Sequence, residues 1–221
     1  AKMLLGEWEA GWKDYEWRWK KPAFKSPRTG NASPAWEGQN PAGKSVLVYA
    51  EQGLGDTIQF CRYLPFLEAR SAIVDFLLPA PLTGLLTSLP GARRFLTEVP
   101  AGRYDYQCPL LSLPFLMKLP VVPADTPYLR ADSERALQWR DMLKPHGYKI
   151  GICWQANPQG GGRSFPLSAF APLAELPGVR LVSLQKNYGL AQLETRPQGM
   201  AVETLGDRFD DGDNAFFDSA A

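Results

Sequence analysis

The chain is poor in cysteine and histidine and carries almost no net charge. Its 221 residues include three cysteines and one histidine, and the formal net charge is +1. The cysteines, Cys61, Cys108 and Cys153, are odd in number, widely spaced and set among apolar residues, which favours buried reduced thiols over disulfides or a zinc site. The balanced charge provides no basic field, so we expect no nucleic-acid partner.

Long apolar runs are also absent from the sequence. No run approaches the roughly 20 residues that span a bilayer, and the first residues lack the basic, apolar and small-residue order of a signal peptide. We therefore expect a cytoplasmic protein without a membrane span. His146 has no metal-ligand partner at a suitable spacing, and the acidic run at 207–214 lacks the alternation of a calcium loop, so no metal site is expected.

Residues 1–44 are expected to form an aromatic helix followed by a linker. Trp8, Trp12, Tyr15 and Trp19 recur at helical spacing, which places them on one face. Such a face needs a cover, so the helix is expected either to end a longer helical array or to pack on the domain behind it. Prolines and glycines are frequent in 22–44, as is typical of a linker that runs over a surface.

Strands alternate with helices through the rest of the chain, which predicts parallel sheets with right-handed crossovers and an α/β fold. A proline-rich stretch at 119–131 separates a first half, 45–131, from a second half, 132–221, that is expected to be incomplete. The first half is predicted to hold strands at 46–50, 72–79, 92–99 and the start of 104–119, with a helix at 56–70 that Pro65 kinks. The second half is predicted to hold helices at 132–143 and 165–176 and strands at 149–155, 177–186 and 200–205.

A phosphate-binding pattern at 38–45 lies in the wrong place. The letters GQNPAGKS fit the P-loop of nucleotide hydrolases, but such a loop leaves a strand and opens a helix, so that its amides face phosphate. Here the linker precedes the pattern and a strand follows it, and Pro41 removes one amide of the loop. We therefore reject a P-loop at this position.

A better-placed loop follows the first expected strand, in the stretch YAEQGLGDTIQFCRYLP (49–65). Gly53 and Gly55 allow a tight turn and close approach of a ligand, and with Gln52 they are the substrate-binding candidates. Asp56 stands at the start of the following helix, where its negative charge would repel a phosphate. A carboxylate at the carboxyl end of a parallel strand can instead take a proton from an alcohol. The plainer alternative is that Asp56 only caps the helix.

The motifs WEAGWKDYEWRW, YAEQGLGDTIQFCRYLP, CPLLSLP and SLQK resemble those of a known family over nearly the whole chain. This family comprises the glycosyltransferase domains that follow tetratricopeptide repeats in many bacterial proteins. They are related to the lipopolysaccharide heptosyltransferases and, more remotely, to O-linked N-acetylglucosamine transferases. The resemblance implies a GT-B-like architecture with two Rossmann-like domains, the first for the acceptor and the second for a nucleotide sugar.

The resemblance also implies roles for particular residues. Asp56 matches the proposed catalytic base of the heptosyltransferases. The loop WQANPQGGGRS and the segment SLQK match donor-binding segments, and Arg163 and Lys186 would compensate diphosphate charge. The donor-binding candidates are Asn157, Arg163, Ser164, Gln185 and Lys186.

Two functions remain open at this point. The first is an inverting glycosyltransferase that moves a sugar from a nucleotide sugar to a hydroxyl of a protein or glycan acceptor, with the nucleotide sugar as co-substrate and no cofactor or metal. The alternative is a non-catalytic docking module derived from such an enzyme. Either the chain is a fragment, or a helical-repeat region or another chain is expected to cover the incomplete second half.

Overall fold

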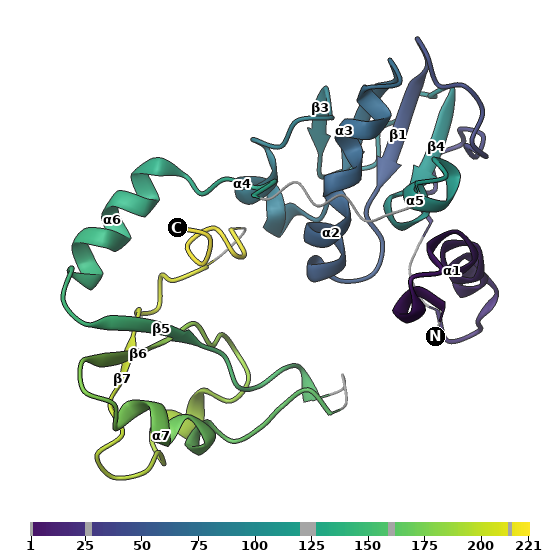
Figure 1. Cartoon of the computed structure of the whole chain (residues 1–221). Helices are drawn as coiled ribbons and strands as arrows, with labels where there is room; N and C mark the ends of the chain where they lie inside the picture. The colour runs from purple at the N-terminus through teal and green to yellow at the C-terminus, as the bar shows by residue number, and fades with distance from the viewer. Residues whose placement is uncertain (1, 25–27, 120–126, 159–161, 212–213) are drawn as a thin grey trace. The chain divides into compact units, whose positions relative to one another are not determined.

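A computed structural model of the chain describes residues 2–24, 28–119, 127–158, 162–211 and 214–221. Its contacts divide the chain into two compact units (Figure 1). Unit 1 comprises Ala1–Ala131 with Gly212–Ala220, and unit 2 comprises Asp132–Asp211 with Ala221. Part of the proline-rich stretch at 119–131, namely 120–126, lies outside the described residues. In the described part of the chain, no helix is both long and apolar enough to cross a membrane.

Unit 1 is built on a parallel sheet of four strands in the order β3-β2-β1-β4. Hydrophobic residues alternate across its central strands, so that Val46, Val48 and Phe76 face the main core while Leu47 and Asp75 face the other side. The predicted parallel α/β architecture is confirmed. The strands are β1 (Ser45–Tyr49), β2 (Ile73–Leu77), β3 (Arg94–Leu96) and β4 (Tyr106–Pro109).

Short helices follow the strands and cover the core face, with α2 and α3 running along it in Figure 1. The helix predicted at 56–70 is divided into α2 (Leu54–Phe60), a 3-10 turn and α3 (Leu64–Glu68). Pro65 lies in the first turn of α3, where its missing N–H breaks no helical hydrogen bond. Elsewhere in unit 1 the helices are η4 (Ala80–Leu82), α4 (Thr83–Leu86), η5 (Leu110–Ser112) and α5 (Leu113–Leu116).

The second face of this sheet buries a charged side chain. The Asp75 side chain is fully buried and accepts hydrogen bonds from Arg93, Arg94 and the Tyr104 hydroxyl, the last at 2.8 Å. Burial opposes ionisation of Asp75, but the bonds from the arginines and the tyrosine outweigh it and lower the pKa to about 2. This carboxylate therefore joins β2 to the start of β3 and to the segment before β4, at Tyr104.

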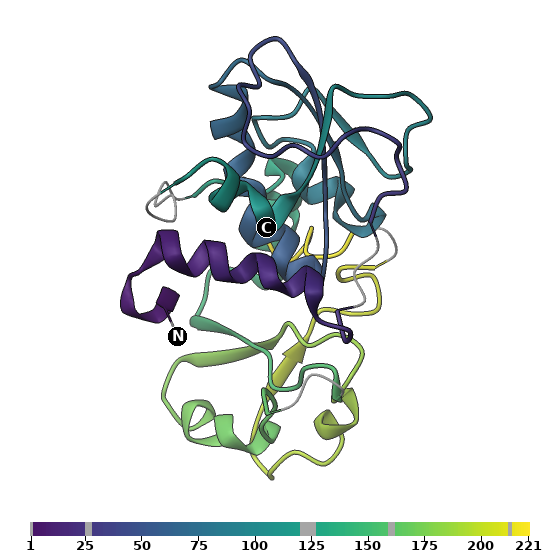
Figure 2. The ribbon, with the colours of Figure 1, turned by 90° about the vertical axis from the view of Figure 1, so that its right-hand side faces the viewer.

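The N-terminal segment packs on the rest of unit 1, as predicted by the alternative in which the helix packs on the domain behind it. It consists of η1 (Lys2–Leu5), α1 (Trp8–Tyr15) and η2 (Glu16–Lys20), and α1 runs into η2 without a break (Figure 2). Trp12 is buried, with its ring edge-on to Phe60 of α2 at 5.7 Å between centroids. The tightening to a 3-10 helix turns Trp19 away from this contact, and its ring packs on Phe24 instead.

The linker before β1 is more closely attached to the sheet than its composition suggests. Ala35 forms a parallel bridge with Gln107 of β4, and Trp36 is buried with its indole N–H donated to the Gln39 carbonyl. The P-loop-like pattern runs straight into β1, and its Lys44 ammonium pairs with Asp105 at 3.3 Å. The rejection of a P-loop is therefore confirmed by its context in the fold.

Unit 2 repeats the first three strands of unit 1 on a smaller scale. Its parallel strands are ordered β5-β6-β7, just as β1, β2 and β3 are neighbours in unit 1. Ile152, Trp154 and Leu181 form its small core. Its elements are α6 (Ser133–Leu143), β5 (Tyr148–Ile152), η7 (Leu167–Phe170), α7 (Ala171–Ala174), β6 (Val179–Ser183), η8 (Leu190–Leu193) and β7 (Val202–Thr204).

The prediction of three buried cysteines is wrong for one of them. Cys61 and Cys108 are buried in unit 1, whereas Cys153 is exposed just after β5. Alternate residues of β5 face opposite sides of the sheet, and Ile152 and Trp154 take the side covered by the unit 2 core. Cys153, between them, faces the opposite side, so its apolar sequence neighbours misled the prediction.

Candidate functional site

The candidate site lies where the strand order of unit 1 reverses. The chain proceeds from β1 to β2 on one side, while β4 pairs with the other side of β1. In open α/β sheets, ligands bind outside the carboxyl ends of the strands at such a switch point. The two loops that flank it here are Glu51–Gly53 after β1 and the segment that begins at Leu110 after β4.

Asp56 lies at the third position of α2 rather than at its start. The helix begins at Leu54 with Gly53 as its N-cap, and the Asp56 Oδ2 accepts the Gly53 backbone N–H at 3.0 Å. The prediction that the helix starts near Asp56 was therefore two residues late. The side chain is half-buried. Its hydrogen bond holds one carboxylate oxygen against the turn that begins the helix.

The two glycines of the turn differ in what surrounds them. A Cβ at Gly53 would lie 3.3 Å from Asp56 Oδ2, whereas a Cβ at Gly55 would meet nothing within 4 Å. Gly53 thus leaves room for the carboxylate, and Gly55 leaves open space beside the first turn of α2. The substrate-binding role of these two glycines stays a prediction.

Gln52 adopts a left-handed backbone conformation, with φ of 63°. Such a conformation is uncommon and strained for a residue other than glycine. Its side-chain amide donates to the Tyr15 hydroxyl at 2.7 Å, so the exposed Gln52 side chain is directed to the N-terminal segment.

A buried ion pair that the sequence analysis missed fills the base of the switch point. The Arg18 guanidinium donates to both oxygens of Glu51, at 3.2 and 2.6 Å, and the two side chains are 5% and 0% exposed. Arg18 also donates to the Ser112 hydroxyl at 2.8 Å and to Glu16 at 2.6 Å. Ser112 in turn donates to Glu16, and the Leu111 N–H donates to Glu51.

Two signals in the sequence could have revealed this pair. Arg18 follows Tyr15 by three residues, which places it on the aromatic face of the helix rather than on the solvent side. Glu51 directly continues the apolar run VLVYA, so it enters the interior with the strand. Burial raises the pKa of Glu51. The hydrogen bonds and charge of the Arg18 guanidinium oppose that rise, and so does the hydrogen bond from the Leu111 N–H.

The ion pair decides which ligands this switch point can accept. Arg18 contacts both loops, through Glu51 of the first and Ser112 of the second, and its charge is matched by Glu51 and Glu16. Asp56 adds a further carboxylate at the rim. A diphosphate would therefore meet negative charge here, and this network offers no unmatched cation to compensate it.

Two of the donor-binding candidates in unit 2 hold the polypeptide itself. The Gln185 side-chain oxygen accepts the backbone N–H groups of Trp154 and Gln155, at 2.9 and 3.0 Å, and its amide donates to the Gln155 carbonyl. The Ser164 hydroxyl accepts the Ala156 N–H at 3.1 Å. The Gln185 bonds fix the loop after β5 against the end of β6, and the Ser164 bond joins two parts of that loop.

The remaining donor-binding candidates lie nearer to solvent. The Lys186 ammonium donates to the backbone carbonyls of Asp207 and Phe209, so its charge is directed to that segment. Asn157 and Arg163 are exposed on the loop after β5. Residues 159–161 of this loop lie outside the described residues. All five donor-binding candidates lie on the segments after β5 and β6, and their role in binding a donor stays a prediction.

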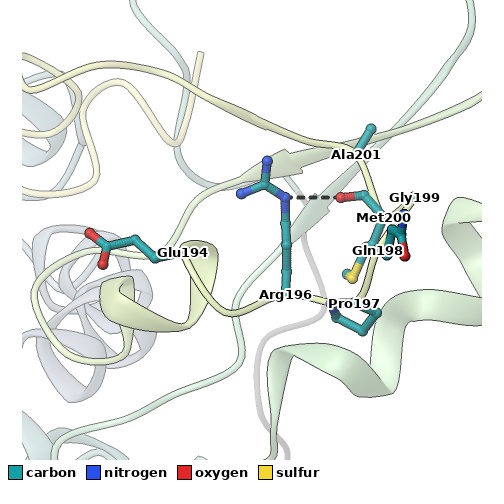
Figure 3. Close-up of a pocket in the computed structure, with 7 residues that line it drawn as sticks. All are labelled: Glu194, Arg196, Pro197, Gln198, Gly199, Met200 and Ala201. Atoms are coloured by element: carbon teal, nitrogen blue, oxygen red, sulfur yellow. Dashed lines mark hydrogen bonds between the residues drawn. The ribbon is translucent and has the colours of Figure 1, made fainter.

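One hollow in unit 2 is formed by the loop before β7. The loop before β7 curls around Arg196, whose Nε donates to the Met200 carbonyl at 3.0 Å (Figure 3). The same guanidinium also donates to the Leu193 carbonyl, so this hollow is shaped by the loop's own hydrogen bonds.

Within the described ranges, no three His, Cys, Asp or Glu side chains gather into a group that could hold a metal ion.

Comparison with known proteins gives one distant similarity. The chain is 27% identical over 236 residues to Protein FlbA of Caulobacter vibrioides, in an alignment that includes 92% of this chain and 38% of FlbA. The chain thus spans well under half of that protein. The alignment is longer than the chain, so the aligned part of FlbA contains residues that this chain lacks. No family model and no solved structure matches.

Proposed function

We propose that the chain is an inverting glycosyltransferase of GT-B type. An acceptor hydroxyl attacks the anomeric carbon of a nucleotide sugar while Asp56 takes the hydroxyl proton. The bond between the anomeric carbon and the diphosphate oxygen breaks, and the diphosphate leaves with the bonding electron pair. The observation that supports this proposal best is the half-buried Asp56 carboxylate at the carboxyl end of the first strand, with one oxygen held by the Gly53 N–H.

The electrostatics of unit 1 support an acceptor role for this turn. Glu51 and Asp56 are both carboxylates, and Arg18 is already matched by Glu51 and Glu16. A neutral sugar or protein hydroxyl can approach such a turn without the repulsion that a diphosphate would meet. A carboxylate held by a single amide still has an oxygen with which to accept a proton.

The donor is proposed to bind the loops after β5 and β6 of unit 2. Arg163 is exposed on the first of these loops and would bear most of the diphosphate charge. Lys186 can contribute only if its ammonium leaves the carbonyls of Asp207 and Phe209. Gln185 and Ser164 are proposed to act mainly by shaping the loop.

A docking module is the second candidate, and one observation favours it. The polar atoms of Gln185 and the ammonium of Lys186 are already engaged by the backbone of unit 2. Calorimetry with UDP, GDP and ADP separates the two candidates. The transferase proposal requires micromolar to millimolar affinity for at least one of these nucleotides, whereas the docking module requires affinity for none.

The catalytic step is tested by Asp56→Asn, which keeps the shape of the side chain and removes the base. Release of nucleoside diphosphate from UDP-, GDP- and ADP-sugars should fall by about 10² to 10⁴, with unchanged nucleotide affinity. Glu68→Gln removes an exposed carboxylate at the other end of the same helical region and should leave turnover unchanged. Full turnover in Asp56→Asn would exclude Asp56 as the base.

A further inference from the structure

We infer that the N-terminal segment is part of the candidate site, in which Tyr15 and Arg18 are positioning residues that orient Asp56. They do so by holding the turn formed by Glu51, Gln52 and Gly53. The effect on catalysis rests on the proposed function, whereas the effect on the turn does not.

Three consecutive residues of this turn are each held by a different partner. Glu51 is bound by the Arg18 guanidinium, the Gln52 side chain donates to the Tyr15 hydroxyl, and the Gly53 N–H donates to Asp56. The first two partners are 33 and 37 residues distant in sequence. The turn is therefore held by another segment of the chain as well as by its own helix.

The backbone of the turn has a strained conformation that these contacts can stabilise. β1 ends at Tyr49 and α2 begins at Leu54, so the chain must change direction within a few residues. It does so with a positive φ at Gln52, a conformation that a glutamine keeps only when its surroundings fix it. The hydrogen bond to Tyr15 and the ion pair on the preceding residue provide that constraint.

The same segment reaches the second loop of the switch point. Arg18 donates to Ser112, and Glu51 accepts the Leu111 N–H, so the loops after β1 and β4 are joined through one guanidinium. Burial is the main cause of the raised pKa of the Tyr15 phenol. The hydrogen bond from Gln52 and the charge of Arg18 oppose the rise, while the nearby carboxylates of Glu51 and Asp56 add to it. Both positioning side chains thus face the turn that carries Asp56.

The test is Tyr15→Phe, which removes one hydroxyl and leaves the ring that packs edge-on to Trp12. Hydrogen exchange by NMR should show the Gly53 amide exchanging about 3- to 10-fold faster, the factor expected for one lost hydrogen bond, while the β1 amides stay unchanged. Turnover should fall by a similar factor at constant nucleotide affinity. Tyr148→Phe, at an exposed tyrosine of unit 2, should change neither quantity.

Gln52→Gly provides a second, independent variant. Glycine adopts positive φ without strain, so this variant should fold at least as well, yet its Gly53 amide should also exchange faster because the contact to Tyr15 is gone. Adding Tyr15→Phe to it should have no further effect. Unchanged Gly53 exchange in Tyr15→Phe would overturn the inference. If the wild-type chain has no turnover, the proposed function fails while exchange still decides the positioning.

Discussion

Replacing Arg18 by methionine should destabilise unit 1 more than most single substitutions. Methionine keeps much of the length of the side chain but removes the charge, leaving Glu51 buried with the Leu111 N–H as its remaining hydrogen bond among those described above. Removing one partner of a buried ion pair costs about 3–5 kcal/mol of the free energy of unfolding. With a urea slope of about 2 kcal/mol/M, the unfolding midpoint should fall by about 1.5–2.5 M.

Tryptophan fluorescence can follow this unfolding, because five of the seven tryptophans precede β1 in unit 1. The loss should shrink as the pH falls from 7 towards 4. Without Arg18, burial raises the pKa of Glu51 in the native state further above its unfolded value of about 4.3. Glu51 then takes up its proton in the native state at a higher pH than in the unfolded chain, so its penalty falls away as the pH drops towards about 4.3. The double variant with Glu51→Gln should recover at least half of the loss, and the exposed Lys21→Met should lose almost nothing.

An Arg18→Met midpoint within about 0.3 M of the wild type would show that the ion pair contributes little to stability. A double variant as unstable as the single one would also contradict the prediction, because the loss would then arise from packing rather than from an unpaired buried charge.

Two further predictions concern other parts of unit 1. Asp75 has its pKa lowered to about 2, so its contribution to stability is present above about pH 4 and is lost as the pH falls towards 2. Asp75→Asn should therefore lower the urea midpoint at pH 7 and flatten that part of the pH profile, with a loss of about 1–2 kcal/mol. A Cβ at Gly84 would lie 3.1 Å from the Phe217 ring, so Gly84→Ala should loosen the C-terminal segment and speed chymotrypsin cleavage at Phe217. Gly102→Ala, where a Cβ meets nothing within 4 Å, should cleave at the wild-type rate.

The elements of the fold could be predicted because local patterns determine them. The apolar run at 46–50 and the alternation of strands with helices predicted the parallel sheets. The helix predicted at 132–143 is α6, which Asp132 caps by accepting the Arg135 N–H. Helix boundaries could not be predicted to the residue. The helix α2 begins at Leu54, with Gly53 as its N-cap, rather than near Asp56.

The contacts between distant segments could not be predicted from pattern. Arg18 and Glu51 are charged, and a rule that places charge at the surface gives the wrong answer once two such residues find each other in the interior. Gln185 was predicted to bind a ligand, yet its side-chain amide binds the backbone of the loop after β5, about thirty residues earlier in the chain. Both cases depend on which segments the fold brings together.

The attachment of the linker to β4 matters to anyone who wishes to cut the chain. A fragment that begins at Ser45 would keep all four strands of unit 1 but would discard Trp36, Trp12 and the segment that bridges Gln107. Its edge strand β4 would then be exposed, and an exposed edge strand can pair with a neighbouring molecule and cause aggregation. Expression trials should therefore retain the N-terminal residues, even where only the sheet is of interest.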